Sequence, residues 1–287
     1  MKTITILIFI SFVLNLHSII AQQTPDTAKL WRIETIDGNE FIGEIESRDT
    51  EKITLRTEVL GLITIQMRNI KSIQEVDKQR MIKGQLWAEN PQATRYFWAP
   101  NGYGLKQGEG YYQNVWVLFN QVSVGITDQV SIGLGMVPLF LFSGSATPVW
   151  ITPKVSIPIK KDAFNLGAGV LAGTVIGDES GVFGIAYGVT TFGNRDQNLT
   201  IGLGYGFADG EWASIPAISI GGMIRIGKRG YLLTENYIIE DVGIITLGGR
   251  TVWSSTSLDY GVALPISGDG FIGIPWLGLV VPFGKKN

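Results

Sequence analysis

The chain contains no cysteine and a single histidine, His17, among its 287 residues. The lack of cysteine excludes a disulfide scaffold, a cysteine-based zinc site and thiol catalysis. His17 lies in a segment that we expect to be removed from the mature protein, so the most common general base is also missing. We therefore expect no enzymatic activity, no bound metal and no cofactor.

Charged residues are also few, at 17% of the chain with a net charge of −2, against 45% hydrophobic residues. A disordered chain needs low hydrophobicity and a nucleic-acid-binding protein needs a basic excess, so neither class fits. No uninterrupted apolar run reaches the 18 residues of a transmembrane helix. The composition indicates a folded protein without a nucleic-acid partner.

Residues 1–21 are typical of a secretory signal peptide. Lys2 supplies a positive charge, residues 4–16 are almost wholly apolar, and Ala21 is a small residue suited to cleavage. An uncleaved anchor is the alternative, but the apolar run is short for a span of about 20 residues. No cysteine follows it to carry a lipid. We expect an exported protein that is cleaved after Ala21.

The distributions of charged residues and of glycine divide the remaining chain into two parts. Residues 22–90 hold 10 Lys and Arg and 12 Asp and Glu, whereas 33 of the 37 glycines follow residue 90. This shift predicts a small module over residues 22–76, a polar linker over residues 77–93 and a glycine-rich domain over residues 94–287.

The small module contains five short alternating segments, and an Asp37-Gly38 pair between the first two favours a hairpin. So short a chain must close its edges to bury a core, which predicts a small five-stranded β-barrel. The run from Asp37 to Ile73 resembles the Sm-like and SH3-like small barrels. We expect it to bind a protein partner in the periplasm. The predicted strands are residues 30–36, 40–47, 52–57, 62–67 and 70–76.

From residue 94 onward, segments of strand length alternate between large apolar residues and small or polar ones. Leu203 and Tyr205 occupy one face of such a segment, and Gly202 and Gly204 occupy the other. A soluble sandwich would need charge on its second face, which is scarce here. In a transmembrane barrel the large face meets lipid and the small face lines the interior. A soluble periplasmic or secreted β-sandwich that binds a ligand or protein remains the alternative.

The turns divide this domain into twelve strands, an even number that places both ends of an antiparallel barrel on one side of a membrane. Lys and Arg concentrate in the turns of one rim, and acidic residues in the turns of the other. The predicted strands are residues 94–105, 112–126, 130–142, 149–159, 164–176, 182–192, 197–207, 213–226, 231–239, 243–254, 257–265 and 271–283.

Aromatic residues cluster near the predicted strand ends, as they do at membrane interfaces. Phe283 ends the last apolar segment and resembles the C-terminal signal of Gram-negative outer-membrane β-barrel proteins, although four residues follow it. This resemblance implies an outer-membrane location, with lipid and the barrel-insertion machinery as partners. The predicted interface residues are Tyr96, Trp98, Tyr112, Trp150, Phe207, Trp212, Trp253 and Phe283.

A charge facing lipid costs about 2–4 kcal/mol at the bilayer midplane, so mid-strand charges are expected to point inward. Three of them lie on consecutive predicted strands, which suggests a network of Glu235, Arg250 and Asp259. Such a network either selects small solutes at a constriction or ties a filled barrel together. The full candidate set is Lys154, Arg225, Glu235, Arg250 and Asp259.

The function predicted from these features is an outer-membrane barrel of structural or narrow-pore type with a periplasmic contact module. The expected loops are short and leave little chain to plug the lumen, which favours a pore unless the linker enters the barrel.

Overall fold

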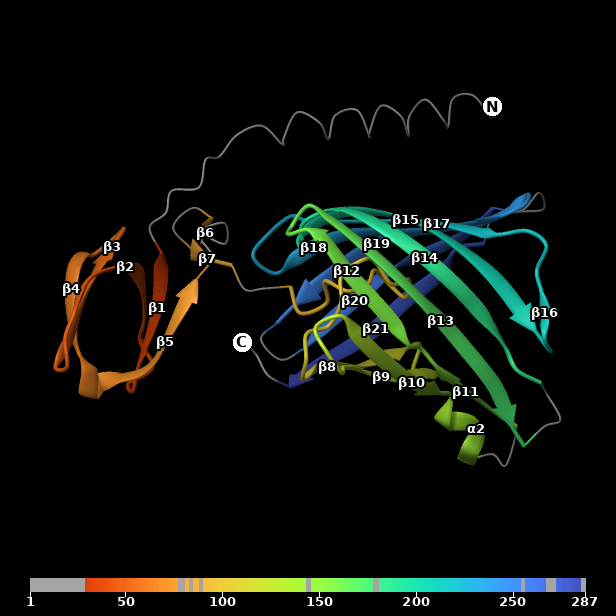
Figure 1. Ribbon diagram of the computed structural model, residues 1–287, viewed down its shortest axis with the longest axis horizontal. Helices are drawn as coiled ribbons and strands as arrows, with labels where there is room; N and C mark the ends of the chain where they lie inside the picture. Colours follow the sequence, from red (N-terminus) through yellow and green to blue (C-terminus); the bar gives the residue numbers. More distant parts are fainter. Residues whose placement is uncertain are drawn as a thin grey trace, which may run out of the picture. The chain divides into compact units, whose positions relative to one another are not determined.

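The chain divides into two units, residues 1–87 and residues 88–287, and nearly all the helices and strands of the described residues are β-strands (Figure 1). The computed structural model describes residues 29–76, 81–82, 85–87, 90–142, 146–177, 181–253, 256–266 and 272–284. The signal-peptide prediction for residues 1–21 lies outside this set.

The N-terminal unit is built on a five-stranded antiparallel sheet in the order β4-β3-β2-β1-β5. Its alternating sequence turns Ile33, Ile53, Leu55 and Ile65 into one apolar core. The five predicted strands are confirmed, and the ends of the third and the fifth match to the residue. The strands are β1 (Leu30–Thr35), β2 (Glu40–Arg48), β3 (Lys52–Thr57), β4 (Gly61–Gln66) and β5 (Ile70–Val76), with a 3-10 turn at Met67–Asn69 before β5.

Two local features complete this unit. Gly38, in the turn between β1 and β2, has a φ of +85°, a conformation that glycine adopts without steric cost. After β5, β6 (Met81–Ile82) and β7 (Gln85–Leu86) pair as a two-stranded antiparallel sheet within the predicted linker.

The second unit is a closed antiparallel barrel with twelve strand positions around its wall. Closure comes from the pairing of β21 with β8. The alternative two-sheet sandwich is therefore wrong, because all wall strands belong to one sheet. The elements are β8 (Glu109–Val115), β9 (Phe119–Gly125), β10 (Val130–Met136), α2 (Pro138–Phe142), β11 (Thr147–Ile151), β12 (Lys154–Lys160), β13 (Phe164–Ile176), β14 (Phe183–Gly193), β15 (Gln197–Ala208), β16 (Glu211–Trp212), β17 (Ala217–Arg225), β18 (Gly230–Ile239), β19 (Val242–Val252), β20 (Ser257–Ile266) and β21 (Ile274–Gly284).

Two of these elements share one wall position. β11 and β12 both lie between β10 and β13, so they are halves of a single interrupted strand. The two-residue β16 only extends the edge of β15.

The strand count is confirmed, but two errors cancel within it. Residues 94–105, predicted as the first wall strand, lie outside the named strands. Residues 112–126, predicted as one strand, form β8 and β9, joined by a turn in which Trp116 and Val117 have positive φ. This turn contains no Gly, Pro, Asn or Asp, so turn chemistry could not predict it.

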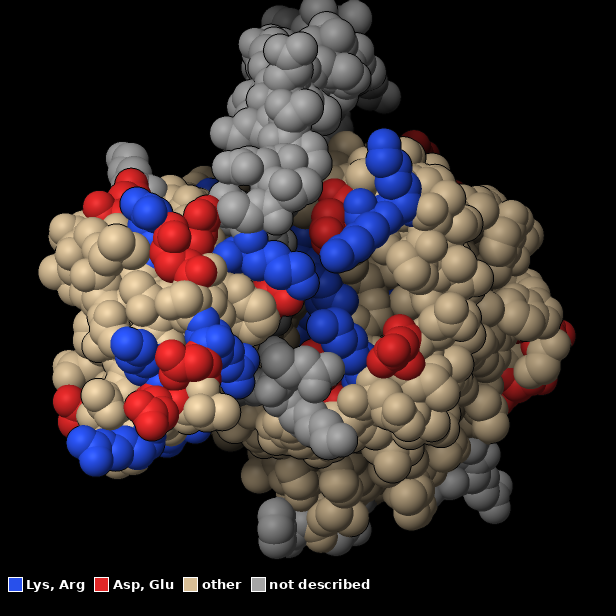
Figure 2. Space-filling view, turned by 60° about the vertical axis from the view of Figure 1, so that its left-hand side comes forward, with Lys and Arg blue, Asp and Glu red and all other residues tan. Residues whose placement is uncertain are grey.

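The two faces of the wall differ as the alternation predicts. On β15, Ile201 and Leu203 are each 49% exposed on the outside, whereas the inward Thr200 is buried. Charged side chains are sparse over the visible barrel wall in Figure 2. The outer surface of the barrel is therefore a broad apolar belt.

The barrel has two rims. At the first rim β9 leads to β10, β12 to β13, β14 to β15, β17 to β18 and β19 to β20. At the second rim β8 leads to β9, β10 to β11, β13 to β14, β15 to β17, β18 to β19 and β20 to β21. Lys106–Gly110 belongs to the first rim, because the Gln107 N–H donates to Asp128 Oδ1, in the connection between β9 and β10, at 3.0 Å. Among the described residues, no helix has the length and hydrophobicity to cross a membrane.

Candidate functional site: a hairpin inside the barrel

Residues 90–105, which we call the inner hairpin, precede β8 and fold back on themselves. Arg95 and Pro100 form a β-bridge, and the Tyr96 N–H donates to the Ala99 carbonyl at 3.0 Å. The turn between them places Phe97 and Trp98 at the tip. In Figure 1 this segment is the gold stretch within the ring of strands.

The contacts of the inner hairpin reach strands on several sides of the barrel. Tyr96 Oη lies 2.6 Å from Asn198 Oδ1 on β15, and Gln113 Nε2 on β8 donates to the Phe97 carbonyl at 3.0 Å. The open end lies at the first rim, where Tyr103 Oη donates to the Gly193 carbonyl at 2.6 Å. The hairpin therefore occupies the barrel interior and enters it from the first rim.

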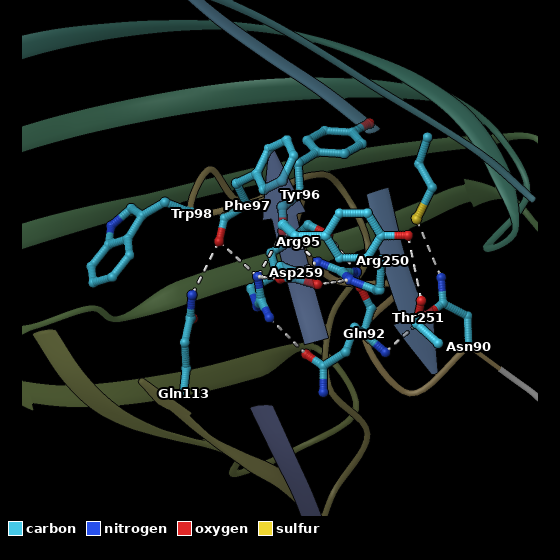
Figure 3. A network of polar contacts seen from close by, with 12 residues as sticks. Asn90, Gln92, Arg95, Tyr96, Phe97, Trp98, Gln113, Arg250, Thr251 and Asp259 are labelled. Atoms are coloured by element: carbon cyan, nitrogen blue, oxygen red, sulfur yellow. Dashed lines mark hydrogen bonds and ion pairs between the residues drawn. The ribbon is translucent and has the colours of Figure 1, made fainter. Parts of the chain in front are cut away.

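Two arginines share one aspartate at the centre of this interior (Figure 3). Arg250 and Asp259 face each other across β19 and β20, with Nε to Oδ1 at 2.5 Å and Nη2 to Oδ2 at 3.0 Å. Arg95, from the inner hairpin, donates from Nη1 to Asp259 Oδ2 at 3.0 Å. All three side chains are buried. The network joins the hairpin to the wall through charge-assisted hydrogen bonds.

The same guanidinium groups bind the backbone of the hairpin. Arg250 donates to the carbonyl oxygens of Gln92 at 2.8 Å and Tyr96 at 2.5 Å. Arg95 donates to those of Tyr96 and Phe97, both at 2.7 Å. Buried carbonyl oxygens need donors, and a short hairpin without flanking strands supplies few of its own. The arginines meet this requirement.

Glu235 on β18 binds the tip of the hairpin. Its Oε2 accepts hydrogen bonds from the backbone N–H groups of Trp98 and Ala99, both at 2.8 Å, and its Oε1 accepts one from Tyr237 Oη at 2.9 Å. The predicted contact with Arg250 is absent among these bonds. In the β18–β19 register, Arg250 pairs with Tyr231 and Glu235 with Thr246, so the two charges lie at different heights in the barrel.

The two remaining predicted charges lie apart from this centre. Lys154 on β12 points inward and donates to the carbonyl oxygens of Tyr103 at 2.5 Å and Thr94 at 3.4 Å. Arg225 ends β17 at the first rim, where its Nη1 lies 2.9 Å from Asp196 Oδ2. The inner hairpin thus meets Lys154, Glu235, Arg250 and Asp259, but Arg225 has a separate ion pair.

Three residues predicted at the membrane interface lie inside the barrel instead. Tyr96 and Trp98 belong to the inner hairpin. Trp150 on β11 faces inward, with its ring centroid 6.1 Å from that of Trp98 and its Nε1 donating to Gln121 Oε1 at 2.8 Å. The prediction was wrong for these three because it treated residues 94–105 as wall and read Trp150 only as lying near a strand end.

The other predicted aromatics lie in the wall or at its rims. Phe207 and Trp212 pack together at the second rim, with ring centroids 5.1 Å apart. Trp253 and Phe283 are exposed at the first rim. Tyr112 lies on β8, where its hydroxyl donates to Asn120 on β9.

A cavity of about 160 Å³, which we call the hairpin cavity, remains between the inner hairpin and the wall. Its lining includes Arg95, Ser123, Ser131, Lys154 and Tyr187. Among the described residues, no cluster of three His, Cys, Asp or Glu is arranged to hold a metal ion. Searches with this chain match no family model and no curated protein.

Proposed function

We propose that this protein is an outer-membrane β-barrel of structural type, closed by its own inner hairpin and carrying the N-terminal sheet as a periplasmic contact module. The observation that carries the proposal is the buried network of Arg95, Arg250 and Asp259, which fixes the hairpin inside the barrel. A lumen filled in this way favours a structural role over an open pore.

The outer surface supports insertion into a membrane. Large apolar side chains such as Ile157, Leu203 and Leu279 are exposed around the wall. In water, an apolar belt of this extent would cause aggregation. In a bilayer, the same side chains contact the lipid chains instead of water. The outer membrane is the compartment that fits a closed barrel preceded by an export signal.

The lengths of the turns support an orientation with the first rim in the periplasm. Outer-membrane barrels have short periplasmic turns and longer outer loops. The second rim carries the longer connections, including residues 137–146 with α2, and the inner hairpin enters at the first rim. This orientation leaves the N-terminal sheet on the periplasmic side, free to bind a protein partner.

The location is tested on outer-membrane fractions, by running the protein on a denaturing gel with and without boiling. A membrane-bound band that shifts on boiling is the expected result for a closed barrel. A soluble protein without a shift would overturn the proposal.

The closed lumen is tested with single cysteines, which the cysteine-free chain makes possible. Ala99→Cys lies at the buried tip of the hairpin and should resist a membrane-impermeant maleimide, while the exposed control Val59→Cys in the β3–β4 turn should react. Purified wild-type barrel should also give no steady conductance in planar bilayers. Rapid labelling of Ala99→Cys together with steady conductance would favour the narrow-pore function instead.

A further inference from the structure

The hairpin cavity is lined by basic side chains but by no acidic ones among the described residues. Two cationic side chains, Arg95 and Lys154, line it, and no Asp or Glu is among the described lining residues. Serine, threonine and tyrosine hydroxyls and the side chain of Gln121 also line it, among a larger number of apolar side chains, and these polar groups can donate hydrogen bonds. The lining thus contains basic side chains and further hydrogen-bond donors.

Lys154 is a buried basic side chain without a carboxylate partner among the described residues. Its side chain is 8% exposed, and its two hydrogen bonds go to the neutral carbonyl oxygens of Thr94 and Tyr103. None of the ion pairs among the described residues includes it. An ammonium group held in a protein interior is costly unless an anion balances it.

Both described carboxyl groups of the interior make their contacts with groups other than Lys154. Asp259 is already shared by Arg95 and Arg250. Glu235 accepts three hydrogen bonds from Trp98, Ala99 and Tyr237. In addition, Nε of Arg95 is buried without a hydrogen-bond partner. The described interior therefore buries three basic side chains and two carboxyl groups, and Arg95 keeps a spare donor next to the cavity.

We propose that the hairpin cavity binds one small oxyanion, a carboxylate or a phosphate, with Lys154 as its main counter-ion. Arg95 and the serine hydroxyls of the wall orient it. Because Lys154 also holds the two arms of the hairpin through Thr94 and Tyr103, the bound anion stabilises the closed position of the hairpin. This site depends on the closed barrel alone, and stands whether or not the outer-membrane location holds.

The test measures thermal unfolding of the folded full-length protein in detergent at constant pH and ionic strength. Sodium phosphate and sodium acetate are titrated separately, with the bulky buffer anion HEPES as the salt control. A saturable rise of the melting temperature, on the order of 5 °C at a hundredfold excess over Kd, is expected for at least one small anion. The comparison of the two shows which oxyanion the cavity prefers.

Two lysines on the same strand provide a matched pair of variants. Lys154→Gln should weaken the binding about tenfold or more, whereas Lys160→Gln, at the exposed end of β12, should leave it unchanged. Ser131→Leu keeps both cations but fills the cavity, and should also lose the response.

If Lys154→Gln does not fold, equilibrium dialysis of the wild type with radiolabelled phosphate, and its displacement by acetate, decides the question. One site per chain is the expected result. The proposal is overturned if the wild type binds neither anion in a saturable manner, or if Lys154→Gln and Ser131→Leu respond as the wild type does.

Discussion

Arg95 and Asp259 are separated by 164 positions in the chain, yet Nη1 of the arginine lies 3.0 Å from Oδ2 of the aspartate inside the barrel. The arginine belongs to the inner hairpin and the aspartate to β20. This contact forms only when the hairpin lies inside the barrel, because its two residues belong to the hairpin and to the wall. Substituting each interior group that holds the hairpin therefore tests whether the hairpin is in this position.

Asp259→Asn should strongly destabilise the barrel, because it leaves the buried Arg95 and Arg250 without their shared counter-ion. Breaking a buried ion pair in this way costs about 3–5 kcal/mol. The measurement is the folded fraction on an unboiled gel along a urea series. Asp241→Asn, in an exposed turn of the second rim, is the control, and equal midpoints for the two variants would contradict the network.

Glu235→Ala should loosen the hairpin tip while leaving the arginine network intact. It removes the acceptor for the buried N–H groups of Trp98 and Ala99, each of which then costs about 1–3 kcal/mol if it finds no other partner. Planar-bilayer recordings should show conductance events that the wild type lacks. Glu211→Ala, on the exposed β16, should remain silent; a silent Glu235→Ala would mean that the tip does not control the lumen.

Gly221→Ala should disturb the hairpin through its packing. A Cβ at this inward position of β17 would lie 2.4 Å from two ring carbons of Tyr96, so the ring must move. Overpacking of this type costs about 1–3 kcal/mol. Gly188→Ala on β14 has open space around its Cβ and should be neutral or slightly stabilising. Thermal unfolding of the two variants checks the difference, and equal stability would contradict the close contact.

The N-terminal sheet should lose stability in acid. The hydroxyl of Thr35 lowers the pKa of Asp37, and the N–H groups of Lys52 and Glu51 lower the pKa of Asp49. A carboxyl whose pKa falls on folding stabilises the fold above its unfolded pKa, near 4, and this contribution is lost as the pH falls through the lower folded value.

Hydrogen exchange of residues 30–76 in the full-length protein, corrected for the intrinsic rate, should therefore show weaker protection below about pH 4. Asp49→Asn should flatten this dependence, while Glu58→Gln in the exposed β3–β4 turn should preserve it. A profile that is the same in Asp49→Asn and wild type would remove Asp49 as a cause.

Leu203→Arg tests the membrane contact of the wall. If the outward face of β15 meets the hydrocarbon core, this change should make the free energy of insertion into lipid vesicles less favourable by about 2–4 kcal/mol. In water, an exposed substitution of this kind changes stability by about 0.5 kcal/mol or less. Leu60→Arg, at a 62% exposed site in the β3–β4 turn of the N-terminal unit, is the matched control. Equal insertion of both variants would argue against a bilayer around the barrel.

Strands with one face outside and one face inside the barrel were predictable, because large apolar residues and small or polar residues alternate along them. β13 matches its predicted range, and β15 differs by one residue, since both alternate strictly and follow clear turns. The partnership of Arg250 and Asp259 was also foreseeable, because they lie on consecutive strands with the same parity. The positions of Glu235 and Arg250 along the barrel axis could not be predicted in the same way. They depend on the register between β18 and β19, and knowing which residues face inward does not define that register.

The inner hairpin escaped prediction for a different physical reason. Its residues are surrounded by the barrel, so Tyr96, Phe97 and Asn101 are all buried and no exposed face remains to mark a period. Its aromatic and glycine content also resembles that of the wall. The Pro100-Asn101-Gly102 run was the available signal, because such residues interrupt strands, and the run directly follows the reversal at residues 96–99 in a segment that was predicted as one strand.

The order of the chain constrains how this molecule can assemble. The inner hairpin immediately precedes β8, and every strand that holds it is synthesised later. Closure waits for the last strand, β21, to reach β8. The hairpin must therefore either dock while the sheet is still open or thread into a finished ring through the first rim. Contacts between residues so far apart in the chain are slow to form. An insertion factor would therefore contribute most while the barrel is folding, and less to the stability of the finished barrel.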